Sequence, residues 1–379
     1  MNDTQPRSLL PNGLRDALPP EAGAEALAIA RLLEVFHANA YDRVDPPLVE
    51  FEQSLLDGPG QVVSPQTFRL MDPVSQRMMG LRADITPQIA RIAATRLSQA
   101  PRPLRLSYAG QVLRVRGNQL RPERQFAQVG VELIGAPEPD ADVEVVVLAA
   151  ESLSAIGIED VSIDLSLPTL VPIVCQDIGL SDNEASRARI ALDRKDPSAL
   201  AGFETSTRSL LTGLLEVAGP VDQAIAALDG LALSERANAM CSGLKETVQR
   251  VASAAPGLGL TIDPVEFRGM EYQTGVSFTI FTPRVRSEVG RGGRYELNSQ
   301  ESATGFTMFM DALVRALPEA DRDALVFIPH GAPPQSAARI RSEGWRTLQG
   351  LSPDVDNSAE ARRLKCSHVL QDDEIVDVK

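Results

Sequence analysis

Residues 105–135, with the sequence RLSYAGQVLRVRGNQLRPERQFAQVGVELIG, decide the fold of this chain. The second half of the stretch alternates with a period of two, which is typical of a strand whose successive side chains point to opposite sheet faces. One predicted face carries Ala127, Val129, Val131 and Leu133, and the other carries Phe126, Gln128, Gly130, Glu132 and Ile134. A similar alternation of Leu104, Leu106 and Tyr108 predicts a strand before it. We therefore expect two antiparallel strands, with Gln128 and Glu132 projecting from one sheet face.

An arginine-rich segment, RVRGNQLRPER, joins the two predicted strands and holds Arg114, Arg116, Arg121 and Arg124. Its residues alone leave two interpretations open. The segment is either a solvated hairpin tip or an anion site, because guanidinium groups bind phosphate and carboxylate in bidentate fashion. The polar face of the second strand is equally ambiguous. On an exposed sheet face it needs no function, whereas a carboxylate in a covered pocket needs a cationic partner such as a ligand ammonium.

Helical patterns surround the strand pair. Residues 21–40 predict an amphipathic helix whose buried face carries Leu27, Ala30, Leu33 and Phe36. In LRADITPQIARIAATRL, Thr86 is the predicted N-cap and Pro87 the first helical residue, while Asp84 adds a carboxylate that the helix dipole favours. A further helix is predicted over residues 138–156, followed by a strand at VSIDLS.

The second half of the chain mixes helical and extended patterns. Residues 182–256 are rich in Ala, Leu and Ser and poor in aromatic residues, which predicts a helical subdomain. The segment VEFRGMEYQTGVSFTIF returns to a strand pattern, and GRGGRY at 290–295 predicts a tight glycine turn. The tail from residue 324 predicts a short strand–helix–strand unit. Residues 305–317 predict a helix with Phe306, Phe309, Met310, Leu313 and Leu317 at helical spacing.

Composition limits the classes of function. The net charge of −14 over 379 residues disfavours tRNA binding, because phosphate neutralisation by a basic surface supplies most nucleic-acid affinity. No apolar run approaches the roughly 20 residues that span a bilayer, and the N-terminus has no secretory signal pattern, so we expect a cytoplasmic protein. The three histidines and three cysteines share no metal-ligand spacing, and no dinucleotide or P-loop motif occurs. No metal or cofactor is expected.

The order of several segments carries a family resemblance. Residues 105–135 resemble motif 2 of class II aminoacyl-tRNA synthetases, and the chain is similar to histidyl-tRNA synthetases over residues 8–135 and 262–317. The other matching segments follow in family order: LLPNGLRDALPPEA (9–22), YDRVDPPLVE (41–50, similar to motif 1), LRADITPQIAR (81–91), FRGMEYQTGVSF (267–278) and GRGGRYELNSQESATGFTMFMDAL (290–313, at the motif 3 position).

The resemblance implies an α+β fold, a class II synthetase-like antiparallel sheet flanked by helices, with a helical insertion and a short C-terminal α/β remnant. The final segment is too short to be the anticodon-binding domain of such a synthetase. The expected domains are a core with motifs 1 and 2 at 1–180, the helical insertion at 181–261, the remainder of the core at 262–318, and the C-terminal α/β segment at 319–379.

Three departures from the synthetase pattern bear on catalysis. The motif 3 arginine, which clamps ATP phosphate in the family, is replaced by Ala312. The acidic residue two places after the motif 2 arginine is Arg116 here, and the second tyrosine of the histidine-specific segment is Gln273. Loss of a guanidinium–phosphate contact costs roughly 2 kcal/mol or more. Adenylation is therefore expected to be severely impaired.

The amino-acid side of the synthetase site is better preserved. One of the matching residues, Arg268, could instead have a purely structural role as the ion-pair partner of an acidic neighbour. A core that keeps histidine contacts and loses ATP contacts resembles the family of ATP phosphoribosyltransferase regulatory subunits. The positions that match histidine-binding residues are Asp84, Thr86, Arg114, Gln128, Glu132, Arg268 and Tyr272.

That resemblance implies a non-catalytic subunit that activates a separate, short-form catalytic subunit and mediates feedback inhibition by free histidine in histidine biosynthesis. The implied partners are this catalytic subunit, a second copy of the chain within a hetero-oligomer, and histidine, without tRNA or membrane. Two alternatives remain open. One is a divergent but active histidyl-tRNA synthetase, and the other is a synthetase paralogue that senses amino acids.

Overall fold

The strand pair expected from the alternation lies in the middle of a large sheet. Strands β5 (Leu104–Leu113) and β6 (Gln125–Ile134) pair antiparallel along their whole length, which confirms the prediction. The chain divides into two compact units, Met1–Leu317 and Pro318–Lys379. The structure, a computed structural model, describes residues 9–58, 60–267, 272–297, 301–318, 324–353 and 355–378.

Within the described part of the first unit, nine strands form one sheet in the order β1-β5-β6-β12-β11-β10-β7-β9-β8. Every pair from β5 through β7 is antiparallel, whereas β1 joins β5 and β9 joins β7 in parallel. This architecture confirms the expected α+β fold. The remaining strands are β1 (Asp42–Arg43), β7 (Ser162–Ser166), β8 (Gly219–Pro220), β9 (Gly259–Ile262), β10 (Gln273–Phe281), β11 (Gly290–Glu296) and β12 (Ser302–Phe309).

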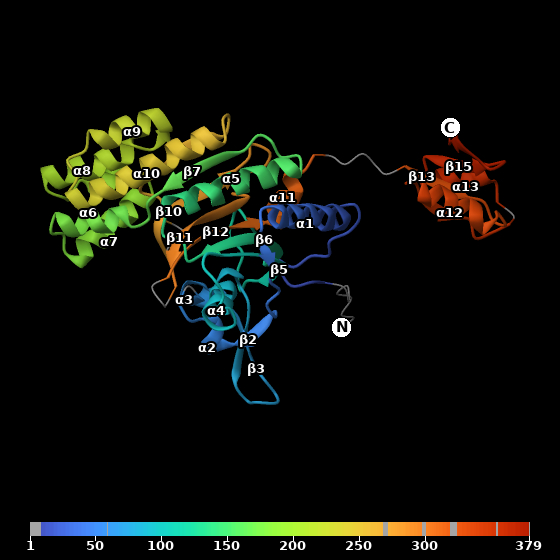
Figure 1. Cartoon of the computed structure of the whole chain (residues 1–379), viewed down its shortest axis with the longest axis horizontal. Helices are drawn as coiled ribbons and strands as arrows, with labels where there is room; N and C mark the ends of the chain where they lie inside the picture. Colours follow the sequence, from blue (N-terminus) through green and yellow to red (C-terminus); the bar gives the residue numbers. More distant parts are fainter. Residues whose placement is uncertain are drawn as a thin grey trace, which may run out of the picture. The chain divides into compact units, whose positions relative to one another are not determined.

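The two faces of this sheet belong to different cores. One side of β6, which includes Val129 and Val131, packs into the large core under helices α1, α5 and α11 (Figure 1). The other side, with Phe126 and Ile134, packs into a smaller core with Tyr108 and helix α4. Both faces assigned from the alternation are confirmed. The helices are α1 (Glu21–Ala38), α4 (Thr86–Thr95), α5 (Pro139–Ala155) and α11 (Met310–Ala316).

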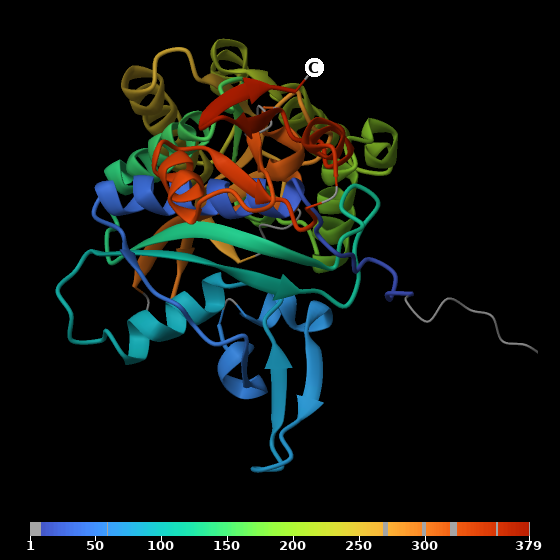
Figure 2. The same cartoon turned by 90° about the vertical axis from the view of Figure 1, so that its right-hand side faces the viewer.

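A small antiparallel sheet, in the order β2-β4-β3, extends away from the large one on the α4 side (Figure 2). Its β4 strand leads directly toward α4, so it positions the residues that precede this helix. The elements of this region are β2 (Val49–Phe51), α2 (Glu52–Leu55), α3 (Gly60–Val63), a 3-10 turn (Ser64–Gln66), β3 (Phe68–Met71) and β4 (Met78–Leu81).

Helices follow β7 and form a lobe beside the sheet (Figure 1). Their buried side chains, including Leu192, Leu211 and Leu244, join the same large core as the sheet. The expected limits of a helical insertion at 181–261 stay a prediction. No described helix is both long enough and apolar enough to cross a membrane. The lobe comprises α6 (Leu170–Asp177), α7 (Asp182–Asp193), a 3-10 turn (Pro197–Leu200), α8 (Thr205–Glu216), α9 (Val221–Asp229) and α10 (Glu235–Ala254).

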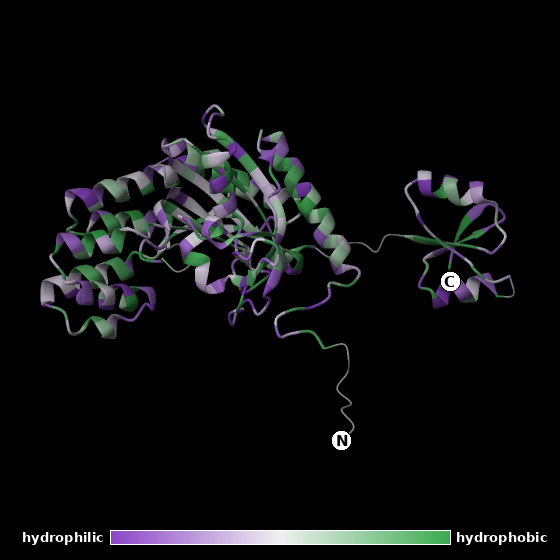
Figure 3. Cartoon of the chain, turned by 90° about the horizontal axis from the view of Figure 1, so that it is seen from below, coloured by the Kyte–Doolittle hydropathy of each residue, from purple (hydrophilic) through white to green (hydrophobic). Residues whose placement is uncertain are grey.

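The second unit is a small α/β sandwich. Its strand order is β14-β13-β15-β16, with the first three strands parallel. Val326 and Ile328 pack on α12 while Phe327 packs on α13, so the helices cover opposite faces of an apolar sheet (Figure 3). The elements are β13 (Leu325–Ile328), α12 (Pro334–Ser342), β14 (Arg346–Gln349), α13 (Asn357–Arg363), β15 (His368–Gln371) and β16 (Glu374–Asp377).

Several local predictions were wrong. The buried stripe of α1 is Ala28, Leu32 and Phe36, while Leu27 is 74% exposed, because steps of three residues drift around a helix of 3.6 residues per turn. The glycine-rich segment 290–295 is not a turn but lies in β11. Residues 302–309 are strand β12 rather than helix, and α11 begins only at Met310.

Candidate ligand-binding site

A cavity of about 250 Å³ lies on the sheet face that carries Glu132, between strands β6, β12 and β11 and the residues around the start of α4. It brings together five of the seven residues predicted to bind histidine, namely Asp84, Thr86, Arg114, Glu132 and Tyr272. The cavity is also lined by residues that had no predicted role, among them Gln66, Arg291, Tyr295, Gly305, Thr307 and Phe309.

The other two predicted residues have different positions. Gln128 is fully buried and is not part of the cavity lining. Its side-chain oxygen accepts a hydrogen bond from the Ile85 amide at 3.0 Å, so it anchors the chain where α4 begins. The Gln128 amide nitrogen has no hydrogen-bond partner among the described residues. Arg268 lies outside the described residues.

Glu132 forms the acidic end of the cavity. Its carboxylate accepts hydrogen bonds from the Thr86 hydroxyl at 2.9 Å and the Tyr295 hydroxyl at 3.0 Å. Burial raises the pKa of Glu132 to about 8, the negative charge of Asp84 acts in the same direction, and the two hydroxyl groups oppose it. The carboxyl group is therefore mostly protonated at neutral pH until a cationic group approaches it.

Thr86 has a different role from the predicted one. It is the first residue of α4 and makes no capping hydrogen bond, because its hydroxyl donates to Glu132 and lies 3.3 Å from the Tyr108 hydroxyl. The Asp84 carboxylate instead accepts a hydrogen bond from the Thr86 amide at 3.1 Å. Tyr108 in turn lies 2.6 Å from the hydroxyl of Thr307 on β12. A continuous chain of hydroxyl groups thus orients the acidic end of the cavity.

Two guanidinium groups line the cavity. Arg114 follows β5, donates from Nε to the carbonyl oxygen of Ala83 at 3.2 Å, and lies over the ring of Phe126. Burial lowers the pKa of Arg114 to about 10, with Asp84 opposing the shift, so the side chain stays cationic at neutral pH. Arg291 on β11 forms an ion pair with Glu288 at 2.8 Å. The cavity therefore combines carboxyl groups and guanidinium groups, as a zwitterionic ligand requires.

Glycines allow close packing at the cavity and on the sheet behind it. A Cβ atom at Gly305 would overlap the Glu132 carboxylate and the carbonyl oxygen of Val131. On β11, a Cβ atom at Gly292 would overlap the carbonyl oxygen of Gly305 and the Phe278 ring of the large core, so this glycine allows close packing behind the cavity. Residues 290–295, which were predicted as a turn, are therefore glycine-rich because neighbouring strands and side chains approach β11 closely. Such close approach is a common reason for glycine within a strand.

Comparison with known proteins agrees with this arrangement. The histidyl-tRNA synthetase family pattern matches residues 13–313. The ATP phosphoribosyltransferase regulatory subunit of Rhodospirillum centenum is 54% identical over 96% of this chain and 94% of its own length. That of Paramagnetospirillum magneticum is 51% identical over the full length of both. This chain belongs to the family of ATP phosphoribosyltransferase regulatory subunits.

Solved structures support the same family and fold. A Bacillus halodurans crystal structure, described as an ATP phosphoribosyltransferase regulatory subunit/histidyl-tRNA synthetase, matches with a TM-score of 0.82 and 25% identity over 94% of this chain and 97% of its own. Histidyl-tRNA synthetase from Nostoc matches with a TM-score of 0.78 and 18% identity over 97% of this chain and 92% of its own. The latter likeness concerns the fold alone.

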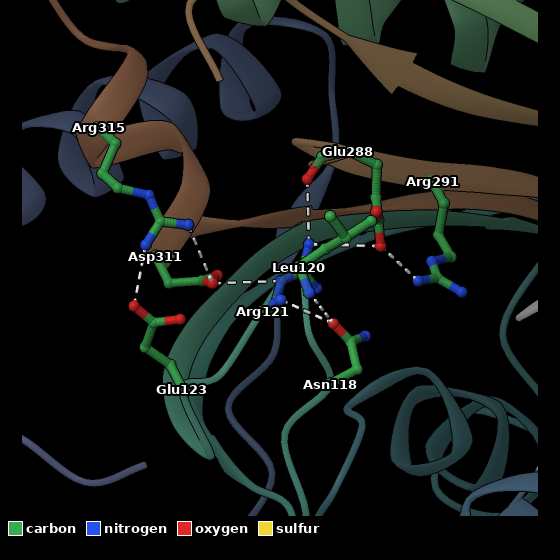
Figure 4. Close-up of polar contacts among 8 residues, drawn as sticks. All are labelled: Asn118, Leu120, Arg121, Glu123, Glu288, Arg291, Asp311 and Arg315. Carbon is green, nitrogen blue, oxygen red and sulfur yellow. Dashed lines mark hydrogen bonds and ion pairs between the residues drawn. The ribbon is translucent and has the colours of Figure 1, made fainter. Parts of the chain in front are cut away.

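In this member of the regulatory-subunit family, contacts with other parts of the same chain hold the arginine-rich loop in place (Figure 4). The Arg121 side chain is buried, donates from Nη2 to the carbonyl oxygen of Glu288 at 3.0 Å, and lies 3.8 Å over the ring of Phe309. Its Nε lies 3.2 Å from Asp311 with poor hydrogen-bond geometry, so this contact is mainly between charges. The Asn118 side chain accepts hydrogen bonds from the amides of Leu120 and Arg121, which fixes the tip.

The loop therefore combines features of both interpretations. Arg116 is exposed, as a solvated tip requires. Arg124 has a local structural contact, since it donates a hydrogen bond to the carbonyl oxygen of Arg114. Arg114 reaches the cavity, as an anion site requires. Arg121 fits neither interpretation, because two carboxylates of the same chain already neutralise it.

The lining residues missed by sequence reasoning come mainly from two strands. Arg291 and Tyr295 lie on β11, and Thr307 and Phe309 lie on β12. The signal that could have found them is a period of two, which places Arg291, Gly293 and Tyr295 on one face of β11. In β12 the period is harder to see, because the strand is buried on both faces and carries apolar residues on both.

A separate acidic group lies beside the helical lobe. Carboxylate oxygens of Asp164, Asp263 and Glu266 lie within 4.8 Å of one another. Lys195 pairs with Asp263 at 2.5 Å, and the Thr261 hydroxyl donates to Asp164 at 2.7 Å. Because the protein itself supplies a cation and a donor to this group, it carries no argument for a metal.

Proposed function

We propose that this chain is the histidine-sensing regulatory subunit of ATP phosphoribosyltransferase. It assembles with a separate short-form catalytic subunit, activates it, and transmits inhibition by free histidine. Family membership supports the regulatory role. The observation that carries the histidine part is the cavity, whose lining combines the carboxyl groups of Asp84 and Glu132 with the guanidinium group of Arg114.

The size of the cavity supports a single amino acid as ligand. Its volume of about 250 Å³ is below the roughly 300–1,000 Å³ of pockets for drug-sized molecules. Phe309 and Arg121 pack against each other next to it, and Arg121 is committed to Asp311 and Glu288. Ala312, at the position of the family's ATP-binding arginine, is fully buried in the large core. These features favour binding of histidine but not of ATP, so we expect no aminoacylation.

Regulation follows from linkage. Histidine changes the output of the assembly only as far as it binds one conformation more tightly than another. We infer that a dimer forms through residues 41–50, the motif 1 segment, and that the catalytic subunit joins this dimer.

A divergent histidyl-tRNA synthetase is the second candidate. It is favoured by the family pattern over residues 13–313 and by the double description of the Bacillus halodurans relative. Histidine-dependent exchange between ATP and pyrophosphate separates the two candidates. Robust exchange by this chain would contradict the regulatory proposal.

Reconstitution tests the proposal directly. The full chain is mixed with a short-form catalytic subunit, and phosphoribosyl-ATP formation is followed with and without histidine. We expect activation by the chain and its reversal by histidine. Glu132→Gln should weaken the inhibition, and Glu151→Gln, a change at an exposed position of α5, should not. Absence of both activation and co-elution would overturn the proposal.

A further inference from the structure

Arg291 occupies a corner of the cavity diagonal to Glu132. On the sheet, Arg291 pairs with Thr307, and Thr307 pairs with Gly130 on β6, two residues before Glu132. With strands about 4.8 Å apart and a rise of about 3.3 Å per residue, the Cα atoms of Arg291 and Glu132 are about 12 Å apart. The positions between them carry Gly130, Thr307 and Gly305, so Arg291 and Glu132 lie on one sheet face with small residues between them.

Arg291 is held in this position from behind. Its Nη2 donates to Glu288 at 2.8 Å, and its guanidinium carbon lies 5.3 Å from the ring centre of Phe309. Glu288 also contacts the buried Arg121, which binds Asp311 in turn (Figure 4). These contacts leave Arg291 at the cavity wall, where its side chain is 26% exposed. The guanidinium is thus oriented before any ligand binds, which limits the entropy lost on binding.

A second positive charge lies on the same side. Arg114 also lines the cavity, and the positive charge of Arg291 is one of the influences that lower its pKa, after burial. Two guanidinium groups that repel each other are both stabilised by an anion bound between them. Glu132 lies diagonally across the cavity from Arg291 and is held by the hydroxyl chain. Asp84 lies closer to Arg114, on whose pKa its charge also acts, and its carboxylate is engaged by the Thr86 amide at the start of α4.

We propose that Arg291, together with Arg114, binds the carboxylate of the amino-acid effector, whose ammonium lies at Asp84 and Glu132. This inference rests on the proposed function for the identity of the effector. It adds that Arg291 makes effector binding depend on a free carboxylate. Arg291 is then a specificity residue. It distinguishes free histidine from histidine derivatives whose carboxyl group is reduced or blocked.

Calorimetric titration of the full chain with L-histidine and with L-histidinol tests this assignment. Histidinol keeps the ammonium and imidazole and replaces the carboxylate by a hydroxymethyl group. A charge-assisted hydrogen bond contributes about 1.5–3 kcal/mol, so the wild-type chain should prefer histidine by roughly 10- to 100-fold. Arg291→Gln should weaken histidine binding by a similar factor, leave histidinol binding unchanged, and so remove the preference.

Matched variants keep the test decisive. Arg291→Lys retains the positive charge and should recover part of the preference, whereas Arg286→Gln, at an exposed position in the segment before β11, should bind both ligands as the wild type does. A fold defect in Arg291→Gln would weaken both ligands equally, and that result, or an unchanged preference, would overturn the assignment. Inorganic phosphate is the third probe. Arg291-dependent phosphate binding that does not compete with histidine would also overturn it.

The outcomes separate this inference from the proposed function. If the wild-type chain binds histidine and Arg291→Gln keeps the preference, the assignment of Arg291 fails and the proposed function stands. If the wild-type chain binds no histidine, both fail.

Discussion

Replacing Glu132 by glutamine is expected to uncouple histidine binding from pH. In the free protein the pKa of Glu132 is raised to about 8 by burial, with Asp84 adding to the shift. A cationic group of the ligand stabilises the ionised carboxylate, so binding lowers this pKa and releases a proton wherever the free protein still holds it. Affinity should therefore rise with pH up to about pH 8 and level off above it. Glutamine is close in shape and cannot release the proton.

The magnitude follows from this pKa. At pH 7 the group is about nine-tenths protonated and at pH 8 about half, so binding should release about 0.9 and then about 0.5 proton. The ratio of ionised fractions makes histidine bind about fivefold more tightly at pH 8 than at pH 7. This window begins above the ordinary imidazole pKa of about 6.5, which keeps titration of the ligand ring from dominating the result.

Calorimetry in buffers of different ionisation enthalpy measures the released protons. The wild type and the exposed-site control Glu151→Gln should show the proton release and the fivefold gain. Glu132→Gln should bind more weakly and show neither. A wild type that releases no proton at pH 7, or a Glu132→Gln variant with the same pH dependence, would refute the reasoning.

Three further predictions concern the same region. Arg121→Met should lower the free energy of unfolding by about 3 kcal/mol, because it removes the closer partner of the buried Asp311 and leaves only the more distant Arg315, at 3.9 Å. The double variant with Asp311→Leu should recover much of that loss in urea titrations, and a double variant less stable than Arg121→Met would contradict the pairing. Gly305→Ala should abolish histidine binding in calorimetry, since the added Cβ overlaps the Glu132 carboxylate, whereas Gly243→Ala in open space on α10 should be tolerated. Finally, the folded state keeps a proton on Glu132 that the unfolded chain loses near pH 4.5. The stability of the wild type should therefore fall between about pH 5 and pH 8 relative to that of Glu132→Gln. Urea midpoints of the two proteins that run parallel across this range would exclude this prediction.

Sequence periodicity correctly predicted strand β6 but did not predict strand β12. In β6, Gln128 and Glu132 interrupt an apolar strand at even positions, so the two faces can be told apart. In β12, Phe306 belongs to the large core and Phe309 to the smaller one. A strand with apolar residues on both faces has no visible period, and its three-residue spacing of phenylalanines suggested a helix instead.

The family resemblance predicted residues of the cavity without predicting their contacts. Asp84, Thr86 and Glu132 were named from matching motifs, and the structure brings them together at the cavity. Gln128 came from the same motif, yet it bonds to the backbone of Ile85 and does not line the cavity. The role of Arg291 depends on pairing between β11, β12 and β6, which no local pattern encodes.

The sequence by itself determined the strand pair around the arginine-rich loop, the α+β class and the relationship to histidyl-tRNA synthetases, because these depend on alternation and on the order of segments along the chain. Only the tertiary structure decided which of the loop arginines are available. Arg121 is neutralised by Asp311 and Glu288, which are distant in sequence, whereas Arg114 reaches the cavity. The physical reason is that burial and charge pairing depend on distances between strands, and these exist only once the sheet has formed.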